Sequence, residues 1–188
     1  FTSKGRCYWI NVYEIPEGNK TSMGRAIQNL MNIAGDEKIL AYLPIENIKD
    51  EEYINSHYVF FCTKNGVIKK TLLEEFSRPR QNGVIAITIR EEDELLDALL
   101  TNGNMEMIIA SKDGRAIRFN ENKVRSMGRT AAGVTGMDLG DNPGNEIIGI
   151  VSVDKSSEVP QTVLVVSEKG YGKRSALEDY RITNRGGK

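Results

Sequence analysis

Four short loops of this sequence contain both arginine and glycine, a combination suited to binding phosphate groups. The tetrapeptide Ser-Met-Gly-Arg occurs at residues 22–25 and again at 126–129, and related loops lie at residues 78–83 and 181–188. Glycine lets backbone N–H groups approach a phosphate closely, and a guanidinium group can bind it through two hydrogen bonds. These four segments, the second tetrapeptide extended to include Arg125, are called the basic loops below and predict an anion-binding surface and not a single pocket.

No arrangement of catalytic or metal-ligating residues is found in the sequence. His57 is the only histidine, and Cys7 and Cys62 lie too far apart for a zinc site, so we expect both cysteines to be reduced core residues. Residues 170–175 (GYGKRS) lack the spacing of a phosphate-binding P-loop. The acidic cluster at residues 91–94 is open to two interpretations, a cation site or a solvated turn, and its recurrence elsewhere favours the turn. We expect no catalytic residue, metal or cofactor in this chain.

The basic loops recur because the chain is built from repeats. Four segments align on the turn glycines Gly5, Gly66, Gly114 and Gly170, which are 61, 48 and 56 residues apart. Asn-Gly and Asp-Gly at residues 65–66 and 113–114 are typical of type I′ hairpin turns, in which both central residues have positive φ. Strand-like runs precede these turns at residues 58–63, 105–111 and 162–167.

An acidic turn followed by a strand-like run lies between consecutive hairpins, with Glu37, Glu94 and Glu146 in the three turns. The leucine pattern of residues 91–103 resembles a helix, but its alignment with the β-branched run at 146–153 favours a strand. Each unit therefore has about four strands, and radial stacking of such units predicts an all-β, propeller-like fold. We expect one repeat domain over residues 1–188 with about three complete blades, in units 1–35 (partial), 36–90, 91–140 and 141–188.

The charged residues are segregated although the formal net charge is only −1. Windows 1–25, 66–90, 114–136 and 170–188 contain 19 of the 25 Lys and Arg but 7 of the 26 Asp and Glu. In a radial array equivalent positions recur around the disc, so these windows predict a curved positive belt. Duplex DNA carries one charge per ~1.7 Å of its axis, and a belt of cations is complementary to it. We therefore expect double-stranded DNA as partner, contacted through its backbone with little sequence preference.

The hydropathy of the chain does not predict a membrane protein. No apolar run approaches the ~20 residues of a membrane span, and residues 1–10 lack the pattern of a signal peptide. The sequence starts in the middle of a repeat, so we expect a fragment of a longer cytoplasmic protein.

Residues 63–83, 115–136 and 170–188, together with 5–30, resemble the C-terminal domain of the DNA gyrase A subunit, of the type IIA topoisomerase family. The resemblance covers essentially the whole chain and implies a β-pinwheel whose blades exchange strands, with DNA wrapped around a positive rim. It further implies that the parent enzyme uses ATP and Mg²⁺ and pairs with the gyrase B subunit to introduce negative supercoils. Its nucleophilic tyrosine, metal site and ATPase would lie outside this chain.

Two departures from the family leave alternatives open. The family's Gln-Arg-Arg-Gly-Gly-Lys-Gly box normally lies in the first blade, and here only residues 184–188 resemble part of it. The C-terminal domain of topoisomerase IV, which lacks a proper box and wraps DNA weakly, is therefore one alternative. A propeller that binds protein partners is another, and an exposed apolar patch would then replace the basic rim.

The resemblance carries a set of candidate DNA-binding residues over to this chain. Because successive side chains of a strand face opposite sides, we expect at most one of Lys69 and Lys70, and one of Lys173 and Arg174, to reach DNA. The candidates are Arg25, Lys69, Arg78, Arg80, Arg118, Arg125, Arg129, Lys173, Arg181, Arg185 and Lys188.

Overall fold

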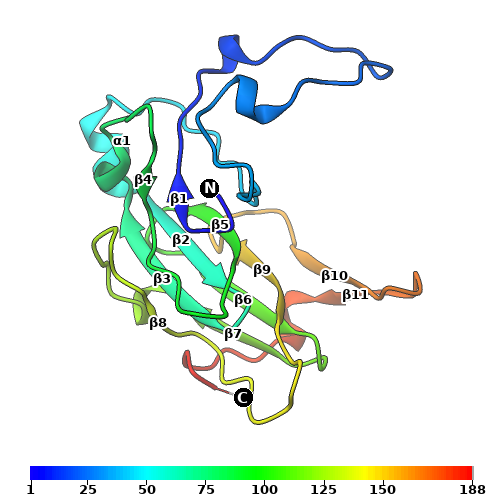
Figure 1. Cartoon of the computed structure of the whole chain (residues 1–188). Coiled ribbons are helices and arrows are strands. Elements are labelled where there is room, and N and C mark those ends of the chain that lie inside the picture. The colour runs from blue at the N-terminus through cyan, green and yellow to red at the C-terminus, as the bar shows by residue number, and fades with distance from the viewer. Residues whose placement is uncertain (188) are drawn as a thin grey trace.

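The computed structural model describes residues 1–187 and shows a chain of small antiparallel sheets with few helices (Figure 1). This confirms the predicted all-β class. The one α-helix, α1 (Glu51–Ser56), was not predicted, and it begins where the Asp50 side chain accepts the N–H groups of Glu52 and Tyr53. The strands are β1 (Arg6–Cys7), β2 (Tyr58–Thr63), β3 (Val67–Leu72), β4 (Val84–Ile85), β5 (Leu95–Thr101), β6 (Glu106–Ser111), β7 (Ala116–Asn120), β8 (Val134–Thr135), β9 (Ile147–Val153), β10 (Thr162–Val166) and β11 (Gly172–Ala176), and the 3₁₀ turns are η1 (Val12–Glu14), η2 (Ile27–Asn29), η3 (Leu73–Phe76), η4 (Glu121–Lys123) and η5 (Leu177–Asp179).

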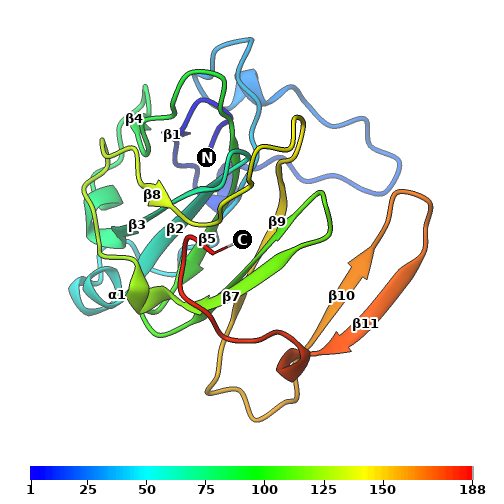
Figure 2. The same ribbon diagram turned by 90° about the horizontal axis from the view of Figure 1, so that it is seen from below.

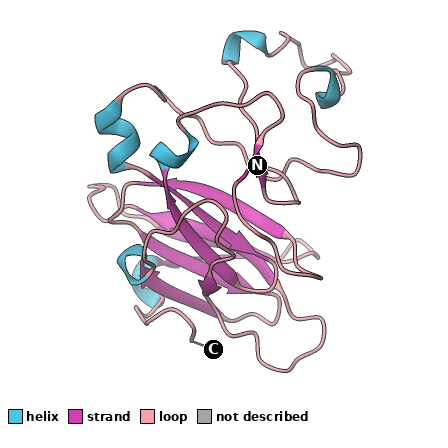
Figure 3. Cartoon of the chain, turned by 60° about the vertical axis from the view of Figure 1, so that its left-hand side comes forward, coloured by secondary structure: helices cyan, strands magenta, loops and turns pink. Residues whose placement is uncertain are grey.

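Neighbouring units exchange strands. The hairpin β2–β3 is flanked by β5 and β8, which both follow it in the chain, in the order β5-β2-β3-β8. The hairpin β6–β7 is likewise extended by β9 of the next unit, and Figure 3 shows these strands stacked as successive layers. The expectation that residues 91–103 form a strand is confirmed by β5, which pairs Leu100 with Val59.

The hairpin turns differ from the predicted type. Gly66 and Gly114 have positive φ (80° and 85°), but Asn65 and Asp113 do not. The N–H of each glycine donates to the carbonyl three residues earlier, that of Thr63 (3.1 Å) or Ser111 (3.0 Å). This is the three-residue loop in which a type I turn ends on a left-handed glycine, so the type I′ prediction is wrong.

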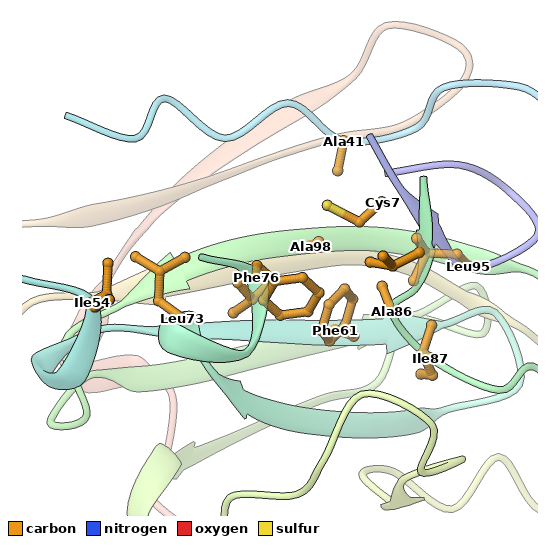
Figure 4. Close-up of a cluster of buried hydrophobic side chains, with 12 residues drawn as sticks. Cys7, Ala41, Ile54, Phe61, Leu73, Phe76, Ala86, Ile87, Leu95 and Ala98 are labelled. Carbon is orange, nitrogen blue, oxygen red and sulfur yellow. The ribbon is translucent and has the colours of Figure 1, made fainter. Parts of the chain in front are cut away.

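Two apolar clusters hold the layers together. One lies between β2, η3 and the segments around β1 and β4, with Phe61 and Phe76 at its centre and Leu95 at one side (Figure 4). The other lies between the β2–β3 and β6–β7 hairpins and contains Phe60, Ile109 and Phe119. The two cysteines are buried and free, one in each cluster, as predicted.

Candidate nucleic-acid interface

Two of the basic loops, at residues 78–83 and 125–129, lead into a short strand that pairs with the preceding unit. After β3 and η3 the chain passes through residues 78–83 and returns as β4, which pairs with β1 through Cys7 and Val84. After β7 and η4 it passes through residues 125–129 and returns as β8, which pairs with β3 through Ile68 and Val134. This topology places the loops at the exposed margin of the blades, since their flanking strands are the last strands of their sheets.

Most of the predicted loop arginines are exposed and available. Five of them, named at the end of this paragraph, have no side-chain hydrogen bond or ion pair within residues 1–187. The same is true of the exposed Lys173 on β11. Unpaired guanidinium groups at the surface retain their full charge for an anionic ligand. These arginines are Arg25, Arg78, Arg80, Arg125 and Arg181.

Two further loop arginines are held in place by the protein. Arg129 is half-buried and its Nε lies 3.7 Å from Glu75 Oε2. Arg185 is exposed, and its guanidinium donates to the carbonyls of Lys123 and Thr135, both at 3.1 Å. These contacts fix the direction of the two side chains, and the remaining N–H groups of Arg185 stay free for a phosphate.

Lys69 lies inside the protein, contrary to the prediction that it contacts DNA. Its side chain is fully buried, and Nζ donates to the carbonyls of Ala86 (2.5 Å) and Arg129. Burial lowers the pKa of Lys69 to about 7. Lys70, on the other face of β3, is also buried, so neither residue of this pair reaches the surface. Lys69 instead supports the basic loop that carries Arg129.

Arg118 is also structural and not part of a DNA-binding surface. Only 8% of it is exposed, and its Nε donates to Glu106 Oε2 at 2.6 Å. The Glu106 carboxylate is fully buried and also pairs with Lys155. Burial would raise the pKa of Glu106, but the hydrogen bonds from Lys155 and Arg118 outweigh it and hold that pKa below its usual range.

Three lysines at the opposite end of the strands form ion pairs with carboxylates. Lys64, beside the β2–β3 turn, lies 2.7 Å from Glu94, and Lys112, beside the β6–β7 turn, lies 3.4 Å from Glu146. Lys4 pairs with Asp36 in the same way at the first turn. The acidic turns of one unit therefore compensate the turn lysines of the previous unit, while the loops at the other end of the strands keep unpaired arginines.

The sequence prediction omitted one exposed cation of the interface and included a residue that cannot be placed. Lys123 is exposed on η4, two residues before Arg125, and its position within the same basic window could have revealed it. Lys188 lies outside the described residues. Among residues 1–187 no group of three or more His, Cys, Asp or Glu is arranged to hold a metal ion. No helix in that range is long and apolar enough to cross a membrane.

The family model for the DNA gyrase C-terminal domain, a beta-propeller, matches residues 1–46, 57–102, 106–154 and 161–188. The chain belongs to this family. It is 42% identical over 188 residues to the DNA gyrase A subunit of Staphylococcus epidermidis and 41% identical to that of Staphylococcus aureus. Both comparisons cover all of this chain but 20% of the relative, so the chain spans a fifth of their length.

Solved structures of the family share the fold. The C-terminal domain of DNA topoisomerase IV superimposes with a TM-score of 0.84 and 28% identity, over 100% of this chain and 55% of that one. The DNA gyrase A C-terminal domain gives 0.79 and 29% identity, over 99% and 56%. The E. coli ParC C-terminal domain, at 12% identity and a TM-score of 0.72, supports the fold alone. The predicted β-pinwheel is confirmed.

Proposed function

We propose that this chain binds duplex DNA along its basic loops and bends it, as a wrapping module of the DNA gyrase enzyme. The observation that supports this is the division of the cations. The turn lysines Lys4, Lys64 and Lys112 are paired with carboxylates, whereas arginines of the edge loops, such as Arg78 and Arg125, are exposed and unpaired within residues 1–187. Loops repeated along one margin present charge at intervals, which suits a stiff polyanion better than a compact ligand.

Bending sets a requirement on the number of contacts. Smoothly bending a 20–30 bp segment by 40–90° costs on the order of 1–6 kcal/mol, so a single charged contact does not suffice. The loops at residues 78–83, 125–129 and 181–188 belong to successive units and can contact DNA together. In this proposal DNA is recognised through its phosphates, and its sequence matters only through flexibility.

The parent enzyme supplies the rest of the reaction. We propose that it is an ATP-dependent type IIA topoisomerase of the bacterial cytoplasm, that its strand passage uses ATP and Mg²⁺, and that the gyrase B subunit is its partner. This chain contributes the path of the DNA and none of the bond-breaking chemistry. Topoisomerase IV is the alternative: its C-terminal domain has the higher TM-score, 0.84 against 0.79, but the 42% identity over the whole chain is to gyrase A.

A topological assay tests the proposal. Relaxed circular DNA is incubated with the protein and a nicking-closing enzyme, and the linking number is read after the protein is removed. Wrapping shifts the linking number in proportion to the amount of bound protein. The variant Arg125→Ala/Arg181→Ala should reduce the shift, whereas Lys64→Ala/Lys112→Ala, which removes the same charge from paired lysines, should not. Binding in a gel-shift assay without any change of linking number would contradict wrapping.

A further inference from the structure

A side-chain contact between consecutive units recurs at one position of the repeat. In three units the fourth residue after the turn glycine donates a side-chain N–H to a backbone carbonyl of the next unit. The donors differ chemically, being an indole, an ammonium and a guanidinium, so the N–H donor is the feature they share. The contacts are Trp9 Nε1 to Phe76 O (3.1 Å), Lys70 Nζ to Glu121 O (3.1 Å), and Arg118 Nη1 to Leu177 O (2.6 Å) and Tyr180 O (3.2 Å).

The acceptors lie at two positions of the following unit, the seventh residue after its turn glycine (Glu121, Leu177) or the tenth (Phe76, Tyr180). Each carbonyl belongs to the 3₁₀ turn of the following unit, η3, η4 or η5, or directly follows it. Phe76 is the last residue of η3, and its carbonyl has no partner of its own within that turn. The carbonyls of Glu121 and Leu177 also accept the N–H groups of Val124 (2.9 Å) and Tyr180 (3.1 Å), so the side-chain donor is their second partner. Together the contacts join the second strand of one unit to the 3₁₀ turn of the next unit. We call the residue at the donor position the inter-unit latch.

A backbone contact accompanies the latch. The carbonyl of Lys70 accepts the N–H of Met127 at 2.8 Å, and the carbonyl of Arg118 accepts the N–H of Thr183 at 2.7 Å. Lys70 and Arg118 therefore each use their side chain and their backbone on the same neighbouring unit. These two donors are buried, with 6% of Lys70 and 8% of Arg118 exposed, and Trp9 is half-buried.

Arg174 occupies the same position in the last unit without such a neighbour. It is the fourth residue after Gly170 and pairs across the hairpin with Leu164, as Lys70 pairs with Phe60 and Arg118 with Ile108. Its side chain is exposed, and it makes no hydrogen bond or ion pair within residues 1–187.

The hairpin that carries Arg174 also has no neighbouring strand within residues 1–187. Within residues 1–187, β10 and β11 pair only with each other, whereas β2 is flanked by β5, and β6 by β9. Figure 2 shows this ribbon standing apart from the other sheets. Apolar side chains on it are exposed, including Leu164 (66%), whereas its counterparts Phe60 and Ile108 are buried.

We propose that Arg174 is an inter-unit latch and that the β10–β11 ribbon is the docking surface for a further unit of the same repeat, following in the same polypeptide. That unit presents the carbonyls of its 3₁₀ turn to the guanidinium and a strand to the edge of β10. The solved domains of topoisomerase IV and gyrase A, of which this chain covers 55% and 56%, have room for such units. Arg174 thereby has an architectural role and is not a contact to DNA. The inference does not depend on DNA binding.

Hydrogen exchange in the full-length protein tests this inference. Amides of β10 and β11 should be protected, and Arg174→Ala should accelerate their exchange roughly 10- to 100-fold, the effect expected for losing a hydrogen bond from a charged donor. Arg174→Lys should restore part of the protection, because Lys70 performs the same role with an ammonium group. Lys169→Ala removes the same charge from the adjacent exposed turn and should leave the exchange unchanged.

Three outcomes would overturn the proposal. Protection of the ribbon that Arg174→Ala leaves intact would show that the side chain is no latch. Protection that increases with protein concentration would identify a second copy of the chain as the occupant. A loss of DNA affinity in Arg174→Ala with unchanged exchange would assign the residue to the DNA interface instead.

Discussion

The exposed pair Arg78 and Arg80 gives the most direct measure of DNA contact, through the variant Arg78→Ala/Arg80→Ala. Both side chains lie on one basic loop, are exposed and make no hydrogen bond or ion pair within the described residues, so the fold should be unaffected. Each lost phosphate contact lowers the slope of log K against log salt by about 0.9. The double variant should therefore reduce the slope by about 1.8. When the salt concentration rises fourfold, for example from 50 to 200 mM, the affinity of the double variant for DNA should therefore fall by a factor about tenfold smaller than that of the unchanged protein.

Fluorescence anisotropy on two duplexes of unrelated sequence, titrated over a series of salt concentrations, measures the slope. Because the contacts are to phosphates, both duplexes should lose affinity by the same factor. The matched control is Lys64→Ala/Lys112→Ala, which changes the net charge equally but at the end of the hairpins where the lysines are paired. An unchanged slope in the arginine variant, or an equal reduction in the lysine variant, would refute a localised basic rim.

Three further predictions concern the interior. Burial lowers the pKa of Lys69 to about 7, so the unfolded chain binds more protons from pH 7 up to the ordinary pKa of 10.5, and the free energy of unfolding should rise with pH by up to about 1.4 kcal/mol per unit. Urea titrations of Lys69→Met should lack this rise. Arg118→Ala should cost about 1.5–3 kcal/mol in chemical denaturation, because the buried Glu106 loses one of its two cationic partners and keeps Lys155, and a loss below about 1 kcal/mol would contradict the burial argument. Gly66→Ala, whose Cβ would lie 2.7 Å from Met137 O, should lower the melting temperature more than Gly114→Ala, which has open space at a similar φ.

The repeat and its strands could be predicted because they depend on local pattern. The recurrence of turn glycines at Gly66 and Gly114 located both hairpins, and alignment between units identified β5 against its helix-like leucines. The turn type was mispredicted because it depends on a neighbour: the backbone N–H of Asn65 donates to Asp93 Oδ1, 3.0 Å away on the next unit's acidic turn. Such a contact between units cannot be predicted from the Asn-Gly dipeptide alone.

The burial of Lys69 and Lys70 shows that the alternation of side chains along a strand does not predict which of them are exposed. Alternation predicts that one face of β3 is exposed, but strand exchange covers both faces and the edge. Ala86 and Arg129, whose carbonyls accept from Lys69, are 17 and 60 residues away in sequence. The partner of Lys70, Glu121, is 51 residues away. Only the arrangement of successive units brings these acceptors together.

Position within the repeat therefore separates structural from ligand-binding cations better than charge does. The third and fourth residues after a turn glycine lie on a strand that the next unit covers, and Lys69, Lys70 and Arg118 are buried there. Lys173 occupies the third position of its unit, so docking of a further unit would bury it as it buries Lys69. The charge available to DNA then comes from the loops beyond the 3₁₀ turns, and the salt slope should respond to loop variants and not to strand variants. By this reasoning Lys173→Ala leaves the slope of the full-length protein unchanged, and a reduction as large as that of a loop arginine would show that strand cations also contact the duplex.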